Sequence, residues 1–292
     1  MGCGAYKNTL LPTPHTQPLQ HPIGIYDSGV GGLSVLRHIR AQLPHESLVY
    51  VADQAHVPYG ARTQAEIRQF GVEIVHFLRQ QGCKLIVVAC NTATTAALSF
   101  LRQQFPDMPF VGMEPAVKPA AAQTRNGRFG VLATPGTFRS ERYAELLARF
   151  AEKTAVFEDP CLGLVQQIEA GATDDPATDA LLTDILRPML ANGVDTLVLG
   201  CTHYPFVQSA IERVLARLAP VRPVAIIDPA PAVARQTARR LQLHNLLSLA
   251  VFPGRVTLYT SGDPVLLNRF VQSQQSSLAI GKSEVLCLKK FV

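Results

Sequence analysis

The sequence predicts an α/β fold made of two pseudo-symmetric domains with largely parallel sheets. Short runs of β-branched residues alternate along the chain with helical periodicities, a pattern typical of parallel sheets covered by helices. Two segments also repeat the same order of strand, polar turn and helix. The chain has 292 residues, enough for two domains at roughly 150 residues each.

The expected strands follow the apolar runs of the sequence. They are Ile23–Tyr26, Leu48–Val51, Leu85–Ala89, Pro109–Met113, Phe129–Ala133, Thr196–Leu199, Val224–Ile227 and Val256–Thr260. Between them lie amphipathic helical patterns, the clearest of which places Ile67, Phe70, Ile74, Phe77 and Leu78 on one face. Prolines shortly after several of these patterns are expected to end the helices.

The repeat sets a cysteine in an equivalent place in each copy. In the first copy a strand ends at Asp27, and the next strand but one leads into Cys90. In the second copy the corresponding positions are Thr134 and Cys201. Ligands of open parallel sheets bind at the carboxyl ends of the strands. We therefore expect two domains that face each other across one cleft, with one cysteine on each side.

The repeat also suggests domain boundaries. We expect a flexible extension at residues 1–21, a first α/β domain at residues 22–115 plus 226–292, and a second at residues 116–225. The run Val224–Ile227, followed by Asp228-Pro229, is interpreted as the point at which the chain returns to the first domain.

Composition narrows the class of protein. The 47% of hydrophobic residues is ample for two cores, and the 17% of charged residues is too low for a disordered chain. No apolar run approaches the ~18 residues that span a bilayer, so a cytoplasmic location is expected. The net charge of +5 comes from scattered basic residues. That distribution favours small anionic metabolites over nucleic acid or membranes.

The cysteines contain no C-x-x-C pair, and most free cysteines are small buried apolar residues. Cys83, Cys161 and Cys287 are interpreted in this way. Cys90 and Cys201 differ because polar residues follow each of them at the point where a buried strand ends.

Cys90 is followed by Asn91 and Thr92. Two polar side chains at a helix start, with free backbone N–H groups behind them, can clamp a carboxylate. The same N–H groups are expected to lower the pKa of the Cys90 thiol, and the thiolate is its reactive form.

Cys201 is followed by Thr202 and His203. The imidazole lies close enough in sequence to reach the thiol or a substrate. A zinc site would need three or four ligands, and a Cys-His hydrolase would need no second cysteine at an equivalent place. Both alternatives stay open from the residues alone.

Two further turns come where strands end. Asp27 and Ser28 precede a glycine-rich turn that lacks the G-x-G-x-x-G spacing of a dinucleotide site. A carboxylate and a hydroxyl at a helix start there could contact an anionic ligand, or the segment could be only a tight turn. The second is the loop with Tyr59 and Gly60, which alone indicates no function.

Taken together, these segments resemble the glutamate racemases of the aspartate/glutamate racemase superfamily. The resemblance runs from Ile23 to about Asp263 and rests on IYDSGVGGLSVL, PYG, VVACNTATTAAL, GMEPAVKPA, LATPGT, LGCTHYP and SGDP. The CNT and GCTH segments in this order are its most specific part. The superfamily contains related decarboxylases with only one of the two cysteines, so the presence of both favours racemisation.

The resemblance implies two α/β domains with the active site in the cleft between them, and it assigns roles to individual residues. It implies an acid/base pair of Cys90 and Cys201, with Asp27 and His203 as assisting groups that also contact the substrate. It implies further substrate contacts by Ser28, Tyr59, Gly60, Asn91, Thr92 and Thr202. Glu169, in the stretch LVQQIEAG, matches an acid of the family.

The implied reaction interconverts L- and D-glutamate without a cofactor or metal and supplies D-glutamate for peptidoglycan. Inverting an α-carbon requires a base on one face and an acid on the other, which two cysteines from facing domains provide. A pyridoxal enzyme would need a Schiff-base lysine, and only Lys118 lies near a matched motif. Racemisation of aspartate or hydantoin, and a non-catalytic binding protein, are the alternatives. The resemblance allows a homodimer and a uridine-nucleotide cell-wall precursor as activator.

Overall fold

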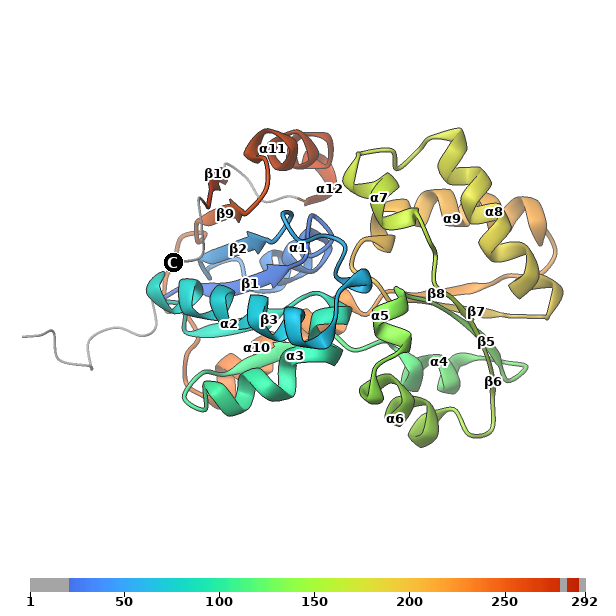
Figure 1. Ribbon diagram of the computed structural model, residues 1–292, viewed down its shortest axis with the longest axis horizontal. Coiled ribbons are helices and arrows are strands. Elements are labelled where there is room, and N and C mark those ends of the chain that lie inside the picture. The colour runs from blue at the N-terminus through green and yellow to red at the C-terminus, as the bar shows by residue number, and fades with distance from the viewer. Residues whose placement is uncertain (1–20, 279–282, 289–292) are drawn as a thin grey trace, which may run out of the picture.

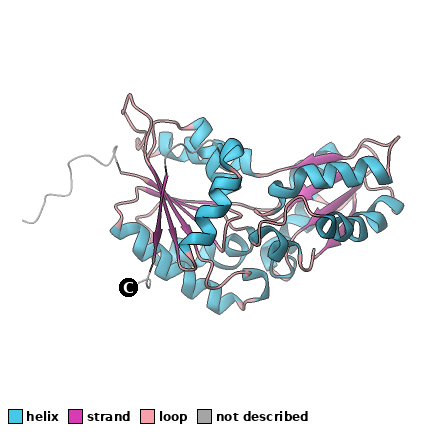
Figure 2. Ribbon diagram, turned by 90° about the horizontal axis from the view of Figure 1, so that it is seen from above, coloured by secondary structure: helices cyan, strands magenta, loops and turns pink. Residues whose placement is uncertain are grey.

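The computed structural model describes residues 21–278 and 283–288 and has the expected α/β fold (Figure 1). Helices surround two separate parallel sheets, which lie in two lobes when the molecule is seen from above (Figure 2). The expected N-terminal extension, apart from His21, lies outside the described residues.

The first sheet has the strand order β10-β9-β2-β1-β3-β4, and every neighbouring pair is parallel. Its strands are β1 (Ile23–Asp27), β2 (Leu48–Ala52), β3 (Leu85–Val88), β4 (Phe110–Gly112), β9 (Val256–Thr260) and β10 (Ser283–Cys287). The second sheet has the order β6-β5-β7-β8 and is also parallel. Its strands are β5 (Arg128–Leu132), β6 (Ala155–Asp159), β7 (Thr196–Leu199) and β8 (Ala225–Ile227).

The structure confirms every expected strand to within a residue at each end and adds β6 and β10. Sequence reasoning missed β6 because it forms an edge of its sheet and carries exposed and half-buried residues in place of a buried apolar run.

The helices pack around the sheets. Those of the first unit are α1 (Leu33–Gln42), α2 (Gln64–Gln80), α3 (Asn91–Gln104), α10 (Ala230–Leu243), α11 (Pro264–Ser273), α12 (Gln275–Leu278) and the 3-10 turn Tyr59–Ala61. Those of the second unit are α4 (Val117–Gln123), α5 (Pro135–Phe138), α6 (Glu141–Phe150), α7 (Leu164–Glu169), α8 (Pro176–Ala191), α9 (Gln208–Leu218) and the 3-10 turn Tyr204–Val207. Within the described ranges, no helix combines the length and the apolar character needed to cross a membrane.

The two sheets are built on one plan. In the first, β1 and β3 are neighbours in the order β2-β1-β3-β4, and in the second, β5 and β7 are neighbours in the order β6-β5-β7-β8. Cys90 therefore follows β3 as Cys201 follows β7, in pseudo-equivalent positions. The repeat seen in the sequence is thus a repeat of topology.

The point at which the chain returns to the first unit lies close to β8. The expected boundary at residue 226 falls inside β8, which pairs with β7 in the second sheet. The next element, α10, packs against α1 and β4 of the first unit. We therefore propose that the return begins after Ile227.

Local sequence explains how α2 is placed behind the cysteine-bearing helix α3. Thr63 and Glu66 form a reciprocal capping box, in which the Thr63 hydroxyl oxygen accepts the Glu66 N–H and the Glu66 carboxylate accepts the Thr63 N–H at 2.8 Å. Ile67, Ile74 and Leu78 of the expected apolar face are buried, and this helix packs on α3.

Replacing Thr63 with alanine should lower the stability of the protein by about 1 kcal/mol, because the Glu66 N–H loses its acceptor and the Glu66 carboxylate loses the Thr63 hydroxyl. The matched control Thr63→Ser keeps the oxygen and should unfold like the unchanged protein. Thermal unfolding followed by circular dichroism measures both variants. Equal unfolding temperatures for the alanine and serine variants would contradict the role of the cap.

Candidate active site

Cys90 occupies the N-cap of α3 and is only 5% exposed. Its sulfur accepts the Ala93 N–H at 3.4 Å, and its thiol lies 3.8 Å from the hydroxyl oxygen of Ser28. Burial and the negative charge of Asp27 raise the pKa of Cys90 to about 12. The expectation that the helix would lower this pKa is wrong, because the loss of hydration outweighs the hydrogen bonds from Ala93 and Ser28.

Cys201 lies at the equivalent end of β7 and is 6% exposed. Its sulfur is 3.6 Å from Nδ1 of His203, whose Nε2 is 2.6 Å from Oε1 of Glu169. Burial alone would lower the pKa of His203, but the hydrogen bonds to Cys201 and Glu169 raise it well above its ordinary value. Glu169, His203 and Cys201 thus form a chain of contacts from carboxylate to imidazole to thiol.

Asp27 joins the two units at the site. Its Oδ2 accepts the hydroxyl of Thr202 at 2.9 Å, and its Oδ1 accepts the Gly29 N–H at 3.0 Å. Burial raises the pKa of Asp27, although the nearby imidazole of His203 works in the opposite direction. The sequence places Asp27 in the same copy as Cys90. In the structure Asp27 also contacts Thr202, the residue that follows Cys201.

Glu169, which the resemblance matches to an acid of the family, lies in the same cluster. It ends α7, and its carboxylate accepts the Val30 N–H at 2.8 Å and the Gln54 amide at 2.9 Å. Burial raises the pKa of Glu169, but the hydrogen bond and charge of His203, with the other two donors, lower it overall. A β-carbon at Gly29 would collide with this carboxylate, which explains the glycine there.

Asn91 and Thr92 follow Cys90 at the start of α3. The Asn91 amide nitrogen donates to the Met113 carbonyl at 3.2 Å, and its buried Oδ1 has no partner among the described residues. The Thr92 hydroxyl lies 2.7 Å from that of Thr134, across the two units. Among the hydrogen bonds of the described residues, none joins the side chain of Asn91 or Thr92 to either thiol.

Tyr59 and Gly60 begin the 3-10 turn that follows β2, and both are buried. The Tyr59 hydroxyl donates to Asp53 at 2.6 Å and is engaged there. Gly60, with Thr134 and Cys161 from the other unit, lines a cavity of about 230 Å³. A ligand could therefore contact the backbone of this loop more readily than the Tyr59 hydroxyl, which is bonded to Asp53.

Sequence reasoning missed the polar residues that follow β2. Buried Asp53 accepts the hydroxyls of Tyr59 and Ser261, each at 2.6 Å, and Gln54 reaches Glu169. A signal was available, because Asp53-Gln54 follows a buried strand just as Asp27-Ser28 does. Thr134 was read only as a strand end, and its partner Thr92 is too far away in sequence to be inferred.

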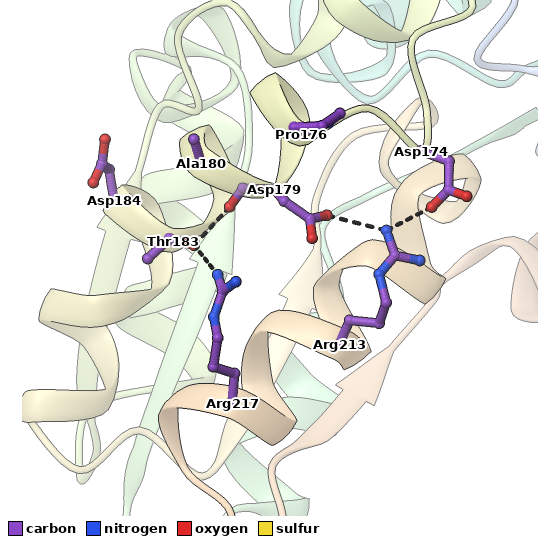
Figure 3. A pocket seen from close by; sticks show the side chains of 8 residues that line it. All are labelled: Asp174, Pro176, Asp179, Ala180, Thr183, Asp184, Arg213 and Arg217. Atoms are coloured by element: carbon purple, nitrogen blue, oxygen red, sulfur yellow. Dashed lines mark hydrogen bonds and ion pairs between the residues drawn. The ribbon is translucent and has the colours of Figure 1, made fainter.

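A separate hollow of about 770 Å³ lies between α8 and α9 (Figure 3). Its lining is charged, but Arg213 pairs with Asp179 at 3.0 Å and with Asp174, and Arg217 bonds to the Thr183 hydroxyl. None of the site residues expected from the sequence lines it. We interpret it as a network of surface ion pairs. In the part of the chain that the structure describes, no three His, Cys, Asp or Glu side chains are grouped to hold a metal ion.

Comparison with known proteins gives a consistent answer. The family model described as Asp/Glu/Hydantoin racemase matches residues 31–237. A glutamate racemase from Pseudomonas aeruginosa is 58% identical over 226 residues, which cover 77% of this chain and 83% of the relative. One from Ectopseudomonas mendocina is 55% identical over 245 residues, 84% of this chain and 90% of the relative.

Solved structures agree. A glutamate racemase from Bacillus anthracis superposes with a TM-score of 0.80 at 32% identity, covering 92% of this chain and 98% of its own. The Escherichia coli glutamate racemase, in complex with L-glutamate and the activator UDP-MurNAc-ala, has a TM-score of 0.78 at 35% identity, covering 91% and 98%. The chain therefore belongs to the Asp/Glu/Hydantoin racemase family and is an isomerase.

Proposed function

We propose that this protein interconverts L- and D-glutamate by a two-base proton transfer at the α-carbon, without a cofactor. The observation that carries the proposal is the pair of buried thiols, Cys90 and Cys201, at equivalent strand ends of two facing units. The curated relatives named as glutamate racemases support the choice of substrate.

In each direction one thiolate takes the α-proton from one face and the other thiol delivers a proton to the opposite face. The two cysteines then exchange protonation states. The thiolate of a cysteine, whose ordinary pKa is about 8.5, is a weak base for removing the α-proton. Exclusion of water and fixed neutral donors around the developing negative charge reduce the barrier. We propose that several neutral donors of this site contact the substrate. They are Ser28, Asn91, Thr92, Thr202, the first N–H groups of α3 and the backbone of residues 59–60.

The two thiols have unlike partners. Burial and the charge of Asp27 raise the pKa of Cys90, which favours its protonated form. Cys201 faces an imidazole that can hold or return a proton. We propose that Glu169 keeps this imidazole oriented and that Asp27 couples the two half-sites through Thr202.

Three rivals are less well supported. A binding protein would need the carboxylate contacts but not two dehydrated thiols. A hydrolase would need a nucleophile and base on one side only. A racemase of aspartate or hydantoin shares the chemistry, and only the similarity to glutamate racemases favours glutamate. A racemase assay on glutamate and aspartate, without added cofactor, separates these functions.

We also propose that the product D-glutamate serves peptidoglycan synthesis in the cytoplasm, and that a uridine-linked cell-wall precursor activates the enzyme. The activator in the E. coli structure supports the second part. A cavity of about 530 Å³ offers a place for such a molecule, since α10 and the second-unit helices α4 and α6 line it together. Lys118 and Arg149 flank the Phe150 ring at 5.5 and 5.0 Å, which suits a ligand with phosphates and a flat base.

Cys90→Ala and Cys201→Ala should each lower racemisation by about 10²–10⁴-fold or more, because inversion cannot proceed with one base. Polarimetry or circular dichroism of glutamate measures the rate. Cys83→Ala removes another buried thiol of the first unit and should stay active. A single-cysteine variant that keeps more than about a hundredth of the unchanged rate would overturn the two-base assignment.

His203→Asn should depress kcat more with L-glutamate than with D-glutamate, because by family resemblance Cys201 takes the proton of the L-enantiomer. Asp27→Asn, beside Cys90, should show the opposite bias. The kcat/KM values of the two directions must stay equal, since the enantiomers have equal free energy in water. Initial rates in both directions with α-deuterated substrate measure the effect. Equal kcat losses in both directions for both variants would refute these helper roles.

Arg235→Ala, at the 530 Å³ cavity, should weaken stimulation by UDP-MurNAc-ala and leave the basal rate unchanged, because an exposed cation near the ligand phosphates is lost. Arg217→Ala, in the separate hollow between α8 and α9, is the matched control. Activation curves for the two variants measure the difference. Identical curves would place the activator elsewhere.

A further inference from the structure

One residue of the polar cluster contacts Glu169 from the other unit. Gln54 follows β2 in the first unit and reaches across to Glu169 of the second. Its amide nitrogen donates to Oε2 of the carboxylate at 2.9 Å, while Oε1 of the same carboxylate faces Val30 and His203. Gln54 therefore contacts the oxygen that the imidazole does not use.

The orientation of the Gln54 amide is fixed by its other neighbour. Fully buried Thr260 accepts the Gly262 N–H at 2.9 Å, and its own hydroxyl lies 2.8 Å from Oε1 of Gln54. The Glu169 carboxylate can only accept, so the NH₂ group of Gln54 faces it. Oε1 of Gln54 is left to accept the hydroxyl proton of Thr260.

This arrangement has a chemical consequence for Cys201. A neutral donor on Oε2 stabilises the carboxylate form of Glu169 without adding a competing charge. It also holds Oε1 toward Nε2 of His203, which directs Nδ1 to the Cys201 sulfur. None of the contacts of Cys90, which are with Ser28 and Ala93, involves Gln54.

We propose that Gln54, held by Thr260, is a positioning residue for the Cys201 half of the site and acts through Glu169 and His203. The proposal rests on the proposed two-base function, because it concerns the proton that Cys201 exchanges. Gln54 does not touch the thiols, and its role is to keep the Glu169 carboxylate anionic and aligned.

The first test compares two substitutions. Gln54→Leu removes the donor and should lower kcat about 10–100-fold in one direction, since small misplacements of a catalytic group have effects of this size. The affected direction should be the one that His203→Asn impairs most. Gln54→Glu keeps the Thr260 contact and can donate only when its carboxyl group is protonated. The rate of Gln54→Glu relative to Gln54→Leu should therefore rise as the pH falls.

The pH profile gives a second readout. The ionisable groups that face Glu169 are His203, Asp27 and Tyr50. The Gln54 hydrogen bond lowers the pKa of Glu169, so its loss in Gln54→Leu raises that pKa. Activity that needs ionised Glu169 then begins to fall at a higher pH, and the acidic limb of the profile moves upward.

Thr260 supplies the matched control pair. Thr260→Ser keeps the hydroxyl and should behave like the unchanged enzyme, whereas Thr260→Val should show the asymmetry of Gln54→Leu in weaker form. Equal losses in both directions for Gln54→Leu, an unmoved acidic limb, or equal effects of Thr260→Ser and Thr260→Val would each overturn the positioning role.

A readout independent of turnover separates this proposal from the proposed function. In protein labelled with ¹⁵N-histidine, the imidazole signals of His203 should change in Gln54→Leu, while those of His76, which packs on Phe105, should not. If the unchanged protein fails to racemise glutamate, the proposed function fails, and the His203 signals still decide whether Gln54 positions the imidazole. Unchanged His203 signals would overturn the role.

Discussion

The site depends on two carboxylates, buried Asp27 and largely buried Glu169, that each reach across the boundary between the units. Asp27 of the first unit accepts from Thr202 of the second, and Glu169 of the second accepts from Val30 and Gln54 of the first. A buried carboxylate is costly unless donors surround it, so each one fixes the opposite unit in place. The same contacts that hold the units together therefore bring Cys90 and Cys201 to a shared site.

Much of this arrangement could be predicted from the sequence because it depends on residues that are close together in the chain. Each apolar run of a buried strand ends in a polar group, as at Asp27 and Cys201, and parallel sheets gather such ends at one edge. The apolar face of α2 could be predicted for the same reason. The topology confirms the repeat, down to the order of strands in the two sheets.

What could not be predicted depends on distance in space and on burial. The edge strand β6 lacks an apolar run because it has a neighbour on one side only. The bond from Gln54 to Glu169 joins positions with no common sequence signal. The direction in which the pKa of Cys90 shifts was predicted wrongly. A helix start can be recognised in the sequence, but the loss of hydration that outweighs its effect cannot.

The two cysteines have unlike surroundings although their positions in the fold are equivalent. A two-base inversion needs one thiol and one thiolate at the start of each turnover. If both sulfurs had the same partners, neither state would be preferred at either position. Here burial and Asp27 favour the protonated form of Cys90, and Cys201 faces an imidazole supported by a carboxylate. Repetition of the fold thus supplies two opposed positions, and divergence of the loops after β2 and in α7 gives those positions different protonation chemistry.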